Sequence, residues 1–377
     1  MTIKLYDTAR GEVVPFEPGP VVTMYTCGLT PYDSSHLGHA AAYVGYDVLQ
    51  RRLRDLGHET RCVRNVTDVD DDILRKAREL GVHYLDLAAA GMARFDEDMR
   101  ALEMLPSWSE PRATSAIADI RKFIGMVLDN GHAYPADGSV WFSVGTRAEY
   151  GELSGRKVDE LQSADPDRGK KHPADFALWK ATKAGEPSWE SPWGPGRPGW
   201  HIECSTLAMR DLETTTLDLH GGGSDLIFPH HECERAQSEA ATGEPFVRHW
   251  MHQAMVRMDG EKMSKSLGNL VFVSDLRKDF DPRAIRLGIV AHHYRDSWSW
   301  NEEIMPAAAA RLERWIAAGP GSGALDEVRA RLDDDLDTPG AVAAIDHAVD
   351  AGEGVSEAAM LLGVDTSRPV ALDLPQV

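Results

Sequence analysis

The stretch VVTMYTCGLTPYDSSHLGH, residues 21–39, holds the pattern that decides the fold class. Its first seven residues alternate and are rich in β-formers, and the pattern breaks at Gly28 and Pro31, which predicts a strand that ends in a loop. Residues 34–53 follow a helical pattern, and residues 61–66 predict a second strand. Strand, helix and strand in this order predict the opening of a nucleotide-binding α/β unit with a parallel sheet.

The rest of the chain predicts mostly helices. Residues from about 70 to 130 are predicted to be largely helical, and residues 133–144 predict a hairpin around Asp137 and Gly138. A short strand is predicted at 217–220. Further helices are predicted at 230–241, 282–293, 306–318, 325–336 and 339–349.

The length of 377 residues, with 42% hydrophobic and 27% charged residues, is enough for one large α/β core and a smaller appendage. We expect a catalytic domain over 1–300 with a connective insertion at about 95–195. A C-terminal helical bundle is expected over 301–364, and a loosely held tail over 365–377.

The composition of the chain indicates which partners and which compartment are compatible with it. The formal net charge of -20 repels phosphate backbones over the surface as a whole, which weakens a tRNA-binding interpretation. The four cysteines are far apart and suit a reducing compartment. Because the first residues form neither a signal peptide nor a long apolar segment, we expect a cytoplasmic protein with no membrane partner.

Two short motifs point to phosphate chemistry. In HLGH, His36 and His39 are three apart near the positive end of a predicted helix, where both imidazoles can donate to phosphate oxygens. Gly38 between them lets a ligand approach closely. In KMSKS, Lys262, Ser264 and Lys265 fall on a Gly-flanked loop, where the lysines can follow charge on a transferring phosphoryl group. We therefore predict that these five polar residues are catalytic.

This pair of motifs resembles the signature of class I aminoacyl-tRNA synthetases. The segments YTCGLTPYD, RNVTDVDD, GRPGWHIECS, GGGSDLIFPHHE and MDGEKMSKSLGN resemble cysteinyl-tRNA synthetase and its paralogue, the mycothiol-pathway cysteine ligase. The resemblance covers the chain from Leu5 to roughly Trp300. It implies a Rossmann-like (HUP-type) parallel-sheet catalytic domain with an insertion and a C-terminal helical bundle. The implied reaction is activation of L-cysteine by ATP, with Mg²⁺ as the companion of ATP, to give cysteinyl-AMP.

The resemblance also implies a metal site. Cys27, Cys204, His230 and Glu234 match the zinc ligands of the family, with one Zn²⁺ per chain, and His231 and Cys233 are nearby competitors. Zinc prefers sulfur over a hydroxyl, so it would separate cysteine from the nearly isosteric serine better than a plain pocket could.

Further site residues are implied by the same resemblance. Trp200 would form a wall of the cysteine pocket, and Val256 would bracket the adenine. The acidic run at 68–72 is interpreted as a helix N-terminal cluster rather than a magnesium site. The residues expected to contact cysteinyl-AMP are Gly28, Leu29, Thr30, Asn65, Val66, Thr67, Trp200, Gly223, Ser224, Asp225 and Val256.

The acceptor of the cysteinyl group is the open question. TPYD, HLGHAAAY, AHHYRDSWSW, DDDLDTP and LLGV look like the ligase. We expect the 111 residues after Ser266 to form a helical bundle but not that bundle together with an anticodon-binding domain. Glu234, Ala42 and the segment SADPDRGKK depart from the ligase pattern. The favoured acceptor is the amine of glucosaminyl-inositol. The alternatives are a cysteinyl-tRNA synthetase without its anticodon domain, a ligase for another small amine, and a non-catalytic relative. The chain is expected to be a monomer or a homodimer.

Overall fold

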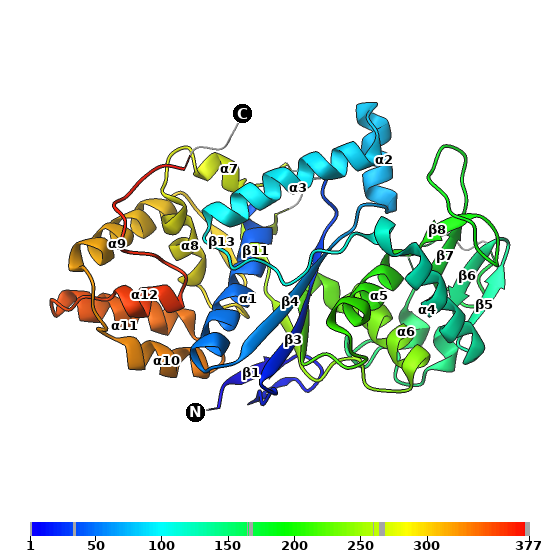
Figure 1. Cartoon of the computed structure of the whole chain (residues 1–377), viewed down its shortest axis with the longest axis horizontal. Helices are drawn as coiled ribbons and strands as arrows, with labels where there is room; N and C mark the ends of the chain where they lie inside the picture. Colours follow the sequence, from blue (N-terminus) through cyan, green and yellow to red (C-terminus); the bar gives the residue numbers. More distant parts are fainter. Residues whose placement is uncertain are drawn as a thin grey trace.

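The computed structural model describes residues 2–32, 35–163, 165, 169–258, 260–263 and 268–373 (Figure 1). At its centre lies a four-stranded sheet in the order β10-β9-β3-β4, in which every neighbouring pair is parallel. Its strands are β3 (Val21–Leu29), β4 (Glu59–Val66), β9 (Leu219–Gly223) and β10 (Trp250–Gln253). Helix α1 (Leu37–Asp55) connects β3 to β4. The predicted strand-helix-strand unit and the parallel α/β sheet are confirmed.

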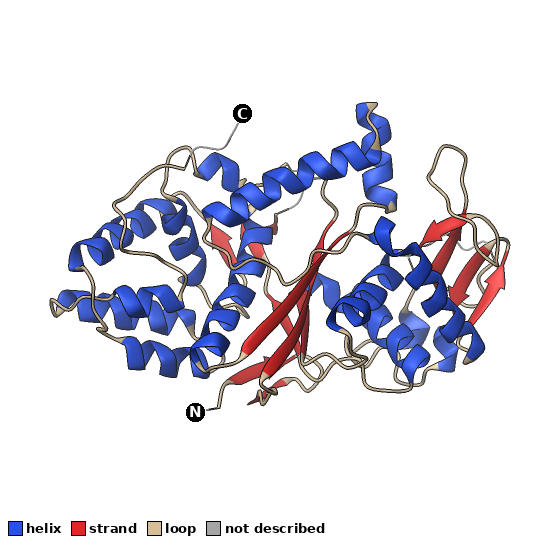
Figure 2. Ribbon diagram, viewed as in Figure 1, coloured by secondary structure: helices blue, strands red, loops and turns tan. Residues whose placement is uncertain are grey.

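Helices lie on both sides of this sheet (Figure 2). On the side of α1 are α8 (Pro282–Val290), α9 (Ile304–Ala318), α10 (Leu325–Asp333), α11 (Thr338–Asp350) and α12 (Ser356–Leu361), and on the other side are α4 (Ile117–Asp129), α5 (Trp200–Leu212) and α6 (Glu232–Thr242). Helices α2 (Asp71–Leu80) and α3 (Tyr84–Ala101) follow β4, and α7 (Val273–Leu276) precedes α8. No helix among the described residues is long and apolar enough to cross a membrane.

The smaller elements complete the fold. Three further sheets consist of β1 (Lys4–Asp7) and β2 (Glu12–Pro15); β5 (Ala133–Ala136), β6 (Ser139–Phe142), β7 (Phe176–Ala181) and β8 (Gly196–Pro198); and β11 (Val256–Met258), β12 (Glu261–Lys262) and β13 (Trp298–Trp300). Short helical turns are η1 (Ala113–Ala116), η2 (Val144–Thr146), η3 (Val158–Glu160), η4 (Ser224–Leu226) and η5 (Ile227–His231). The predicted hairpin is confirmed, because β5 and β6 pair around Asp137 and Gly138, whose φ angles are 50° and 78°.

Both faces of β3 are buried. Met24 packs in a core that includes α1 and the C-terminal helices, whereas Tyr25 packs in a second core that includes α4, α5 and α6. Successive side chains of a strand point to opposite faces, so β3 lies between two helical layers. A nearly continuous run of buried residues is the pattern expected for a parallel strand that is covered on both sides.

Helix α1 begins later than the sequence pattern indicates. The pattern predicts a start near residue 34, but the helix begins at Leu37. His36 is extended, with φ −90° and ψ 162°, and forms an isolated bridge with Phe272. The N–H of Val273 donates to the carbonyl of Ser35 at 3.1 Å. This pairing with a distant segment keeps the backbone extended up to His36, and no local pattern could reveal it.

Buried ion pairs attach the C-terminal helices to α1. The Arg52 guanidinium donates to both carboxylate oxygens of Asp333 on α10, each at 2.8 Å. Arg286 on α8 is fully buried and pairs with Asp47 of α1. Removing one partner of such a buried pair leaves an uncompensated charge, so these contacts fix the helices on one side of the sheet.

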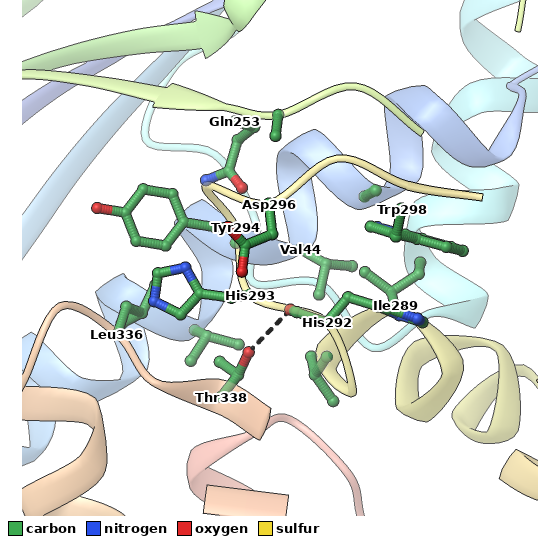
Figure 3. A pocket seen from close by; sticks show the side chains of 15 residues that line it. Val44, Gln253, Ile289, His292, His293, Tyr294, Asp296, Trp298, Leu336 and Thr338 are labelled. Atoms are coloured by element: carbon green, nitrogen blue, oxygen red, sulfur yellow. Dashed lines mark hydrogen bonds between the residues drawn. The ribbon is translucent and has the colours of Figure 1, made fainter. Parts of the chain in front are cut away.

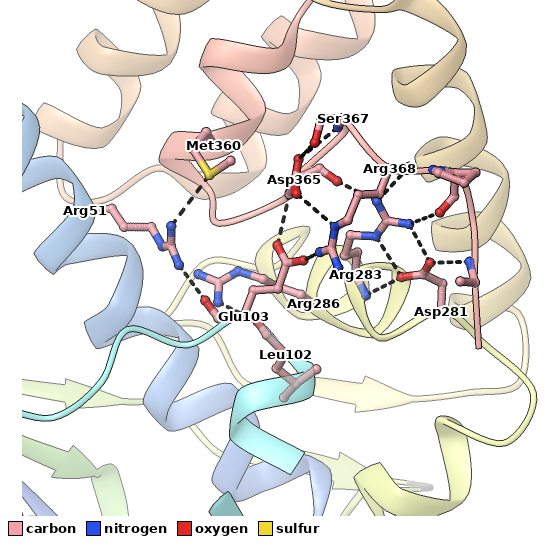
Figure 4. A network of polar contacts seen from close by, with 12 residues as sticks. Arg51, Leu102, Glu103, Asp281, Arg283, Arg286, Met360, Asp365, Ser367 and Arg368 are labelled. Atoms are coloured by element: carbon pink, nitrogen blue, oxygen red, sulfur yellow. Dashed lines mark hydrogen bonds and ion pairs between the residues drawn. The ribbon is translucent and has the colours of Figure 1, made fainter. Parts of the chain in front are cut away.

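Residues 365–373 cross the surface next to α3 and α8 (Figure 4). The sequence predicts a loosely held tail over 365–377, yet the described part is hydrogen-bonded at several points. Arg283 donates to the carbonyl oxygens of Asp365 (2.6 Å), Arg368 (3.0 Å) and Pro369 (2.7 Å). The N–H of Ala371 donates to Asp281 at 2.9 Å. The segment therefore joins α3, α8 and the C-terminal helices.

Candidate active site and metal centre

The carboxyl ends of β3 and β4 form the first part of the site. Asn65 accepts from the backbone N–H of Gly28 at 2.7 Å and donates to the Thr67 hydroxyl at 3.1 Å. A Cβ atom at Gly28 would lie 1.6 Å from the Asn65 carbonyl oxygen, so only glycine fits there. This edge brings together six residues predicted to contact the adenylate, namely Gly28, Leu29, Thr30, Asn65, Val66 and Thr67.

The neighbouring strand β9 supplies the second part. It ends at Gly223, and Ser224 and Asp225 form the turn η4 directly after it. Because β9 pairs with β3 in parallel, this turn reaches the same edge of the sheet as Gly28. Val256 begins β11 and is buried opposite Trp298 of β13.

Pairing between distant segments joins the HLGH motif to residues 271–273, which follow the KMSKS motif in the chain. The His36 and His39 rings stack with centroids 3.7 Å apart at the start of α1. The N–H of Leu37 donates to the carbonyl of Val271 at 2.7 Å, shortly after the KMSKS segment in the chain. Lys262 lies in β12, which pairs with β11. Ser264 and Lys265 lie outside the described residues.

The acidic run is a helix N-terminal cluster, as the sequence predicts. Asp70 is the N-cap of α2, and its carboxylate accepts from the N–H of Ile73 at 2.8 Å. The same carboxylate accepts from the Thr30 hydroxyl at 2.7 Å. Asp71 forms ion pairs with Lys180 and Arg197 from the neighbouring antiparallel sheet. These carboxylates hold α2 and Thr30 in place.

The four predicted metal ligands converge in the interior. Their ligand atoms, from Cys27, Cys204, His230 and Glu234, all lie within 4.8 Å of one another, and all four residues are buried. His230 and Glu234 approach at 3.0 Å, and the Cys27 thiol lies 3.3 Å from Glu234. Two sulfur atoms, one imidazole nitrogen and one carboxylate oxygen form a donor set that suits zinc.

Two observations test the fit of a metal to these donors. The Nε2 atom of His230 is buried and faces Glu234 Oε1 at 3.0 Å, but it forms no hydrogen bond of normal geometry among the described residues, although buried polar atoms are normally satisfied. Its other ring nitrogen, Nδ1, lies 2.8 Å from Nδ1 of His201. Metal-binding histidines typically bond in this way through the nitrogen that faces away from the metal. The residues present therefore fit the ion.

Charges at the centre agree with this interpretation. Burial raises the pKa of Cys204, but its hydrogen bond with Cys27 and the nearby His230 lower it to about 6. Burial and Cys204 raise the pKa of Cys27 well above its usual value. Burial also opposes ionisation of Glu234 and His230, yet their neighbours move the pKa of Glu234 to about 2 and that of His230 to about 10. A bound divalent cation can take the place of the protons that Cys27 and His230 otherwise hold.

A second group of donors overlaps the first. Cys27 and Glu234 also lie within 4.8 Å of ring nitrogens of His220 and His231. His220 Nε2 is 3.1 Å from the Glu234 carboxylate, and His231 Nε2 is 3.2 Å from Cys27 Sγ. The sequence singled out His231 only as a competitor and did not indicate His220. His220 is positioned by the long-range pairing of β9 with β10.

Trp200 lies over the metal centre. It begins α5, its ring stacks on His230 with centroids 4.0 Å apart, and the residue is 37% exposed. One face of the indole therefore covers a proposed ligand, while the rest of the residue reaches the surface. This position is compatible with the predicted wall of a substrate pocket.

A separate cavity lies behind α1, between the loop at 291–298 and α11 (Figure 3). The Thr338 hydroxyl donates to the carbonyl of His292 at 3.2 Å. Asp335 accepts from the Tyr294 hydroxyl at 2.5 Å and from the Tyr6 N–H at 2.8 Å. The segments AHHYRDSWSW and DDDLDTP, both ligase-like in sequence, therefore contact each other at the base of the C-terminal helices.

Comparison with known proteins agrees with this geometry. Residues 13–310 match the family model described as the tRNA synthetases class I (C) catalytic domain. The methionyl-tRNA synthetase of Mycobacterium tuberculosis in complex with methionyl-adenylate superposes with a TM-score of 0.68 at 15% identity, covering 92% of this chain and 88% of that chain. A LeuRS-tRNA-LeuAMS complex from Agrobacterium radiobacter gives 0.65 at 11% identity, covering 93% and 83%. The chain is a class I synthetase-type enzyme, and the predicted fold is confirmed.

Comparison with curated relatives identifies the family more closely. A protein of Streptosporangium roseum named L-cysteine:1D-myo-inositol 2-amino-2-deoxy-alpha-D-glucopyranoside ligase is 46% identical in an alignment of 377 positions that covers 96% of this chain and 92% of that protein. A protein of the same name from Mycobacterium ulcerans is 48% identical over 91% of this chain and 88% of that protein. The chain therefore belongs to the family of these cysteine ligases, which confirms the resemblance seen in its sequence.

Proposed function

We propose that this enzyme condenses L-cysteine with the amine of glucosaminyl-inositol, with ATP as the energy source and cysteinyl-AMP as the intermediate. One observation carries the proposal. The donor set of Cys27, Cys204, His230 and Glu234 lies beside the edge of the sheet that holds Gly28 and Asn65, in a chain that aligns with the named ligases over nearly its whole length. This proximity supports a sulfur-selective centre next to an adenylate site.

In the first step the cysteine carboxylate attacks the α-phosphorus of Mg²⁺-ATP and pyrophosphate leaves. His36 and His39 lie at the positive end of α1, where their ring N–H groups can donate to phosphate oxygens. Lys262 and Lys265, with Ser264, would stabilise charge on the departing pyrophosphate. The turn at Gly223, Ser224 and Asp225 would hold the ribose and Val256 the adenine.

In the second step the acceptor amine attacks the carbonyl carbon of cysteinyl-AMP. The C–N bond forms, the bond to the phosphate oxygen breaks, AMP leaves, and the amine loses a proton to give a neutral amide. Thr30, Asn65 and Thr67 would hold the cysteinyl part, with Leu29 and Val66 beside it and Trp200 as the wall. Bound zinc would hold the substrate as its thiolate and so disfavour serine.

Product identification tests this assignment directly. Zinc-loaded enzyme is given ATP and cysteine with glucosaminyl-inositol, tRNA or another small amine, and the cysteinylated product is identified by mass. We expect the amide of glucosaminyl-inositol. If cysteinyl-tRNA is the sole product, the acceptor is tRNA and not glucosaminyl-inositol. If no cysteine-dependent ATP–pyrophosphate exchange is observed, the proposed adenylation step is rejected. The strongly negative net charge favours the small acceptor, since a polyanionic tRNA would be repelled over most of the surface.

A further inference from the structure

Three side chains extend from the metal centre to the edge of the fold. His231 Nε2 lies 3.2 Å from Cys27 Sγ, and His231 Nδ1 lies 2.7 Å from His252 Nε2. His252 Nδ1 in turn lies 2.7 Å from the Thr8 hydroxyl. His231 and His252 are buried, whereas Thr8 is half-buried in the turn after β1. We name Thr8, His252 and His231 the histidine chain.

The direction of the hydrogen bonds follows from the state of Cys27. A cysteine that binds a metal is a thiolate and can only accept, so His231 Nε2 must donate to it. A neutral imidazole carries one N–H, so with Nε2 of His231 donating, its Nδ1 is the acceptor for His252 Nε2, which lies 2.7 Å away. By the same rule His252, with Nε2 donating, accepts from the Thr8 hydroxyl at Nδ1. Each donor therefore points toward Cys27.

Backbone contacts hold the outer end of this chain in place. The N–H of Thr8 donates to the carbonyl of Trp250 at 2.9 Å, two residues before His252 in β10. The His252 ring is parallel to that of Trp250, with centroids 6.3 Å apart. Thr8 and His252 thus meet because the N-terminal segment is fixed along β10. A hydroxyl held in this way selects one tautomer of His252.

We propose that the histidine chain is a positioning device that holds Cys27 as a hydrogen-bonded thiolate and sets the strength of its bond to the metal. An N–H donor to sulfur stabilises the thiolate form that binds the ion and fixes its orientation, so loss of the donor weakens metal binding. It also draws electron density from the sulfur, so loss of the donor moves the sulfur-to-metal charge-transfer band to longer wavelength. The inference rests on the proposed function only in taking Cys27 as a ligand. Outer partners of this kind typically change metal affinity by about 10- to 100-fold.

The test compares variants that remove or keep single donors. His252→Phe keeps a ring beside Trp250 but cannot donate, Thr8→Val removes only the hydroxyl, and Thr8→Ser restores it. His249→Phe is the matched control, because His249 is equally buried but bonds to the Tyr6 carbonyl at 3.2 Å instead of reaching Cys27. Zinc affinity is measured by chelator competition, and the sulfur-to-metal charge-transfer band is recorded with Co²⁺.

We expect His252→Phe to weaken zinc binding at least tenfold and Thr8→Val about fivefold. Both should move the Co²⁺ band to longer wavelength, while Thr8→Ser and His249→Phe keep the wild-type values. Unchanged affinity and spectrum in Thr8→Val and His252→Phe would overturn the proposal, as would equal losses in His249→Phe. If the His252→Phe variant does not fold, the comparison of Thr8→Val with Thr8→Ser tests the proposal. Metal binding needs no ATP. A wild-type enzyme without ATP–pyrophosphate exchange activity would therefore contradict the proposed function but not this inference.

Discussion

The backbone N–H of Leu37 donates to the carbonyl oxygen of Val271 at 2.7 Å, which ties the first turn of α1 to the segment that follows the lysine loop. The HLGH motif is therefore anchored by main-chain atoms to a residue that follows the KMSKS motif. Anchoring by the backbone depends little on side-chain identity at either position. The described residues on either side of the KMSKS motif are consequently fixed, Lys262 by its place in β12 and Val271 by this bond.

Lys265→Ala should lower the rate of adenylation by about 100-fold while changing the KM for cysteine little. The reason is that its contact with the pyrophosphate would strengthen only as charge develops. Cysteine-dependent ATP–pyrophosphate exchange measures both parameters. The control is Lys278→Ala, which removes an exposed lysine that pairs with Asp275. An unchanged rate in Lys265→Ala would contradict the assigned role.

Cys204→Ser should lose stoichiometric zinc and discriminate poorly between cysteine and serine. A hydroxyl is a weaker ligand for zinc than a thiolate, and the centre would be left with one sulfur. Metal content and the ratio of exchange rates with the two amino acids are the measurements. Cys62→Ser is the matched control, because Cys62 is also buried but contacts Thr26 rather than the metal centre. Retention of one zinc per chain in Cys204→Ser would show that the ligand set is wrong.

Gly28→Ala should abolish exchange and lower the free energy of unfolding by about 1–3 kcal/mol. Its methyl group would collide with the Asn65 carbonyl, so β3 and β4 would have to separate at the adenylate site. Gly125→Ala, in α4, meets no atom within 4 Å and should stabilise the protein by up to about 1 kcal/mol. Urea unfolding followed by fluorescence compares the two, and equal effects would disprove the steric argument.

Asp71→Asn should destabilise the protein in a pH-dependent way. Burial raises the pKa of Asp71, but Lys180 and Arg197 outweigh it and hold the pKa well below its usual value. A carboxyl group whose pKa is lowered in the folded state stabilises the fold at pH values above its unfolded pKa of about 4. This stabilisation is lost as the pH falls further. The side chain is 53% exposed, so we expect only about 0.5–1 kcal/mol at pH 7.

Urea midpoints of wild type and Asp71→Asn at pH 7, 5 and 3 provide the measurement. The two curves should approach each other below about pH 4. Asp72→Asn is the control, since Asp72 pairs with Arg75 on its own helix and not with the neighbouring sheet. A gap between wild type and Asp71→Asn that widens toward pH 3 would reverse the sign of the argument.

Arg283→Ala should release residues 365–373. The guanidinium holds three carbonyl groups of this segment and pairs with Asp281, and all these groups would lose their partner. Limited proteolysis followed by mass spectrometry should then show early cuts in this segment. Arg329→Ala, which removes a partly exposed pair with Asp55, should leave the cleavage pattern unchanged.

Local patterns predicted much of the fold. The strand at residues 21–27 corresponds to β3, the helix at 306–318 to α9, and the helix at 325–336 to α10. These elements have strong periodicity or clear end signals. The short strands β7 and β10 were not indicated, because their few residues are defined by pairing with distant partners. The start of α1 was wrong for the same reason.

The candidate metal centre was also predictable only in part. The resemblance to a known family singled out Cys27, Cys204, His230 and Glu234, and the fold brings all four together. The surrounding hydrogen bonds could not be predicted. Thr8 and His252 are 244 positions apart, and only the placement of the N-terminal segment along β10 brings them into contact. An isolated threonine and an isolated histidine carry no local signal of such a contact.

The order of the strands also has a consequence during synthesis of the chain. Strand β3, which carries Cys27, lies between β4 and β9, and Cys27 and Glu234 are 207 positions apart. At about 5–20 residues per second, a ribosome needs on the order of 10–40 s to pass from one to the other. Until Cys204 and β9 are translated, β3 can pair only with β4 and Cys27 has none of the other three proposed ligands; the full donor set exists only once Glu234 is made. A metal held by all four residues could therefore bind only late, after Glu234 of α6 has been translated.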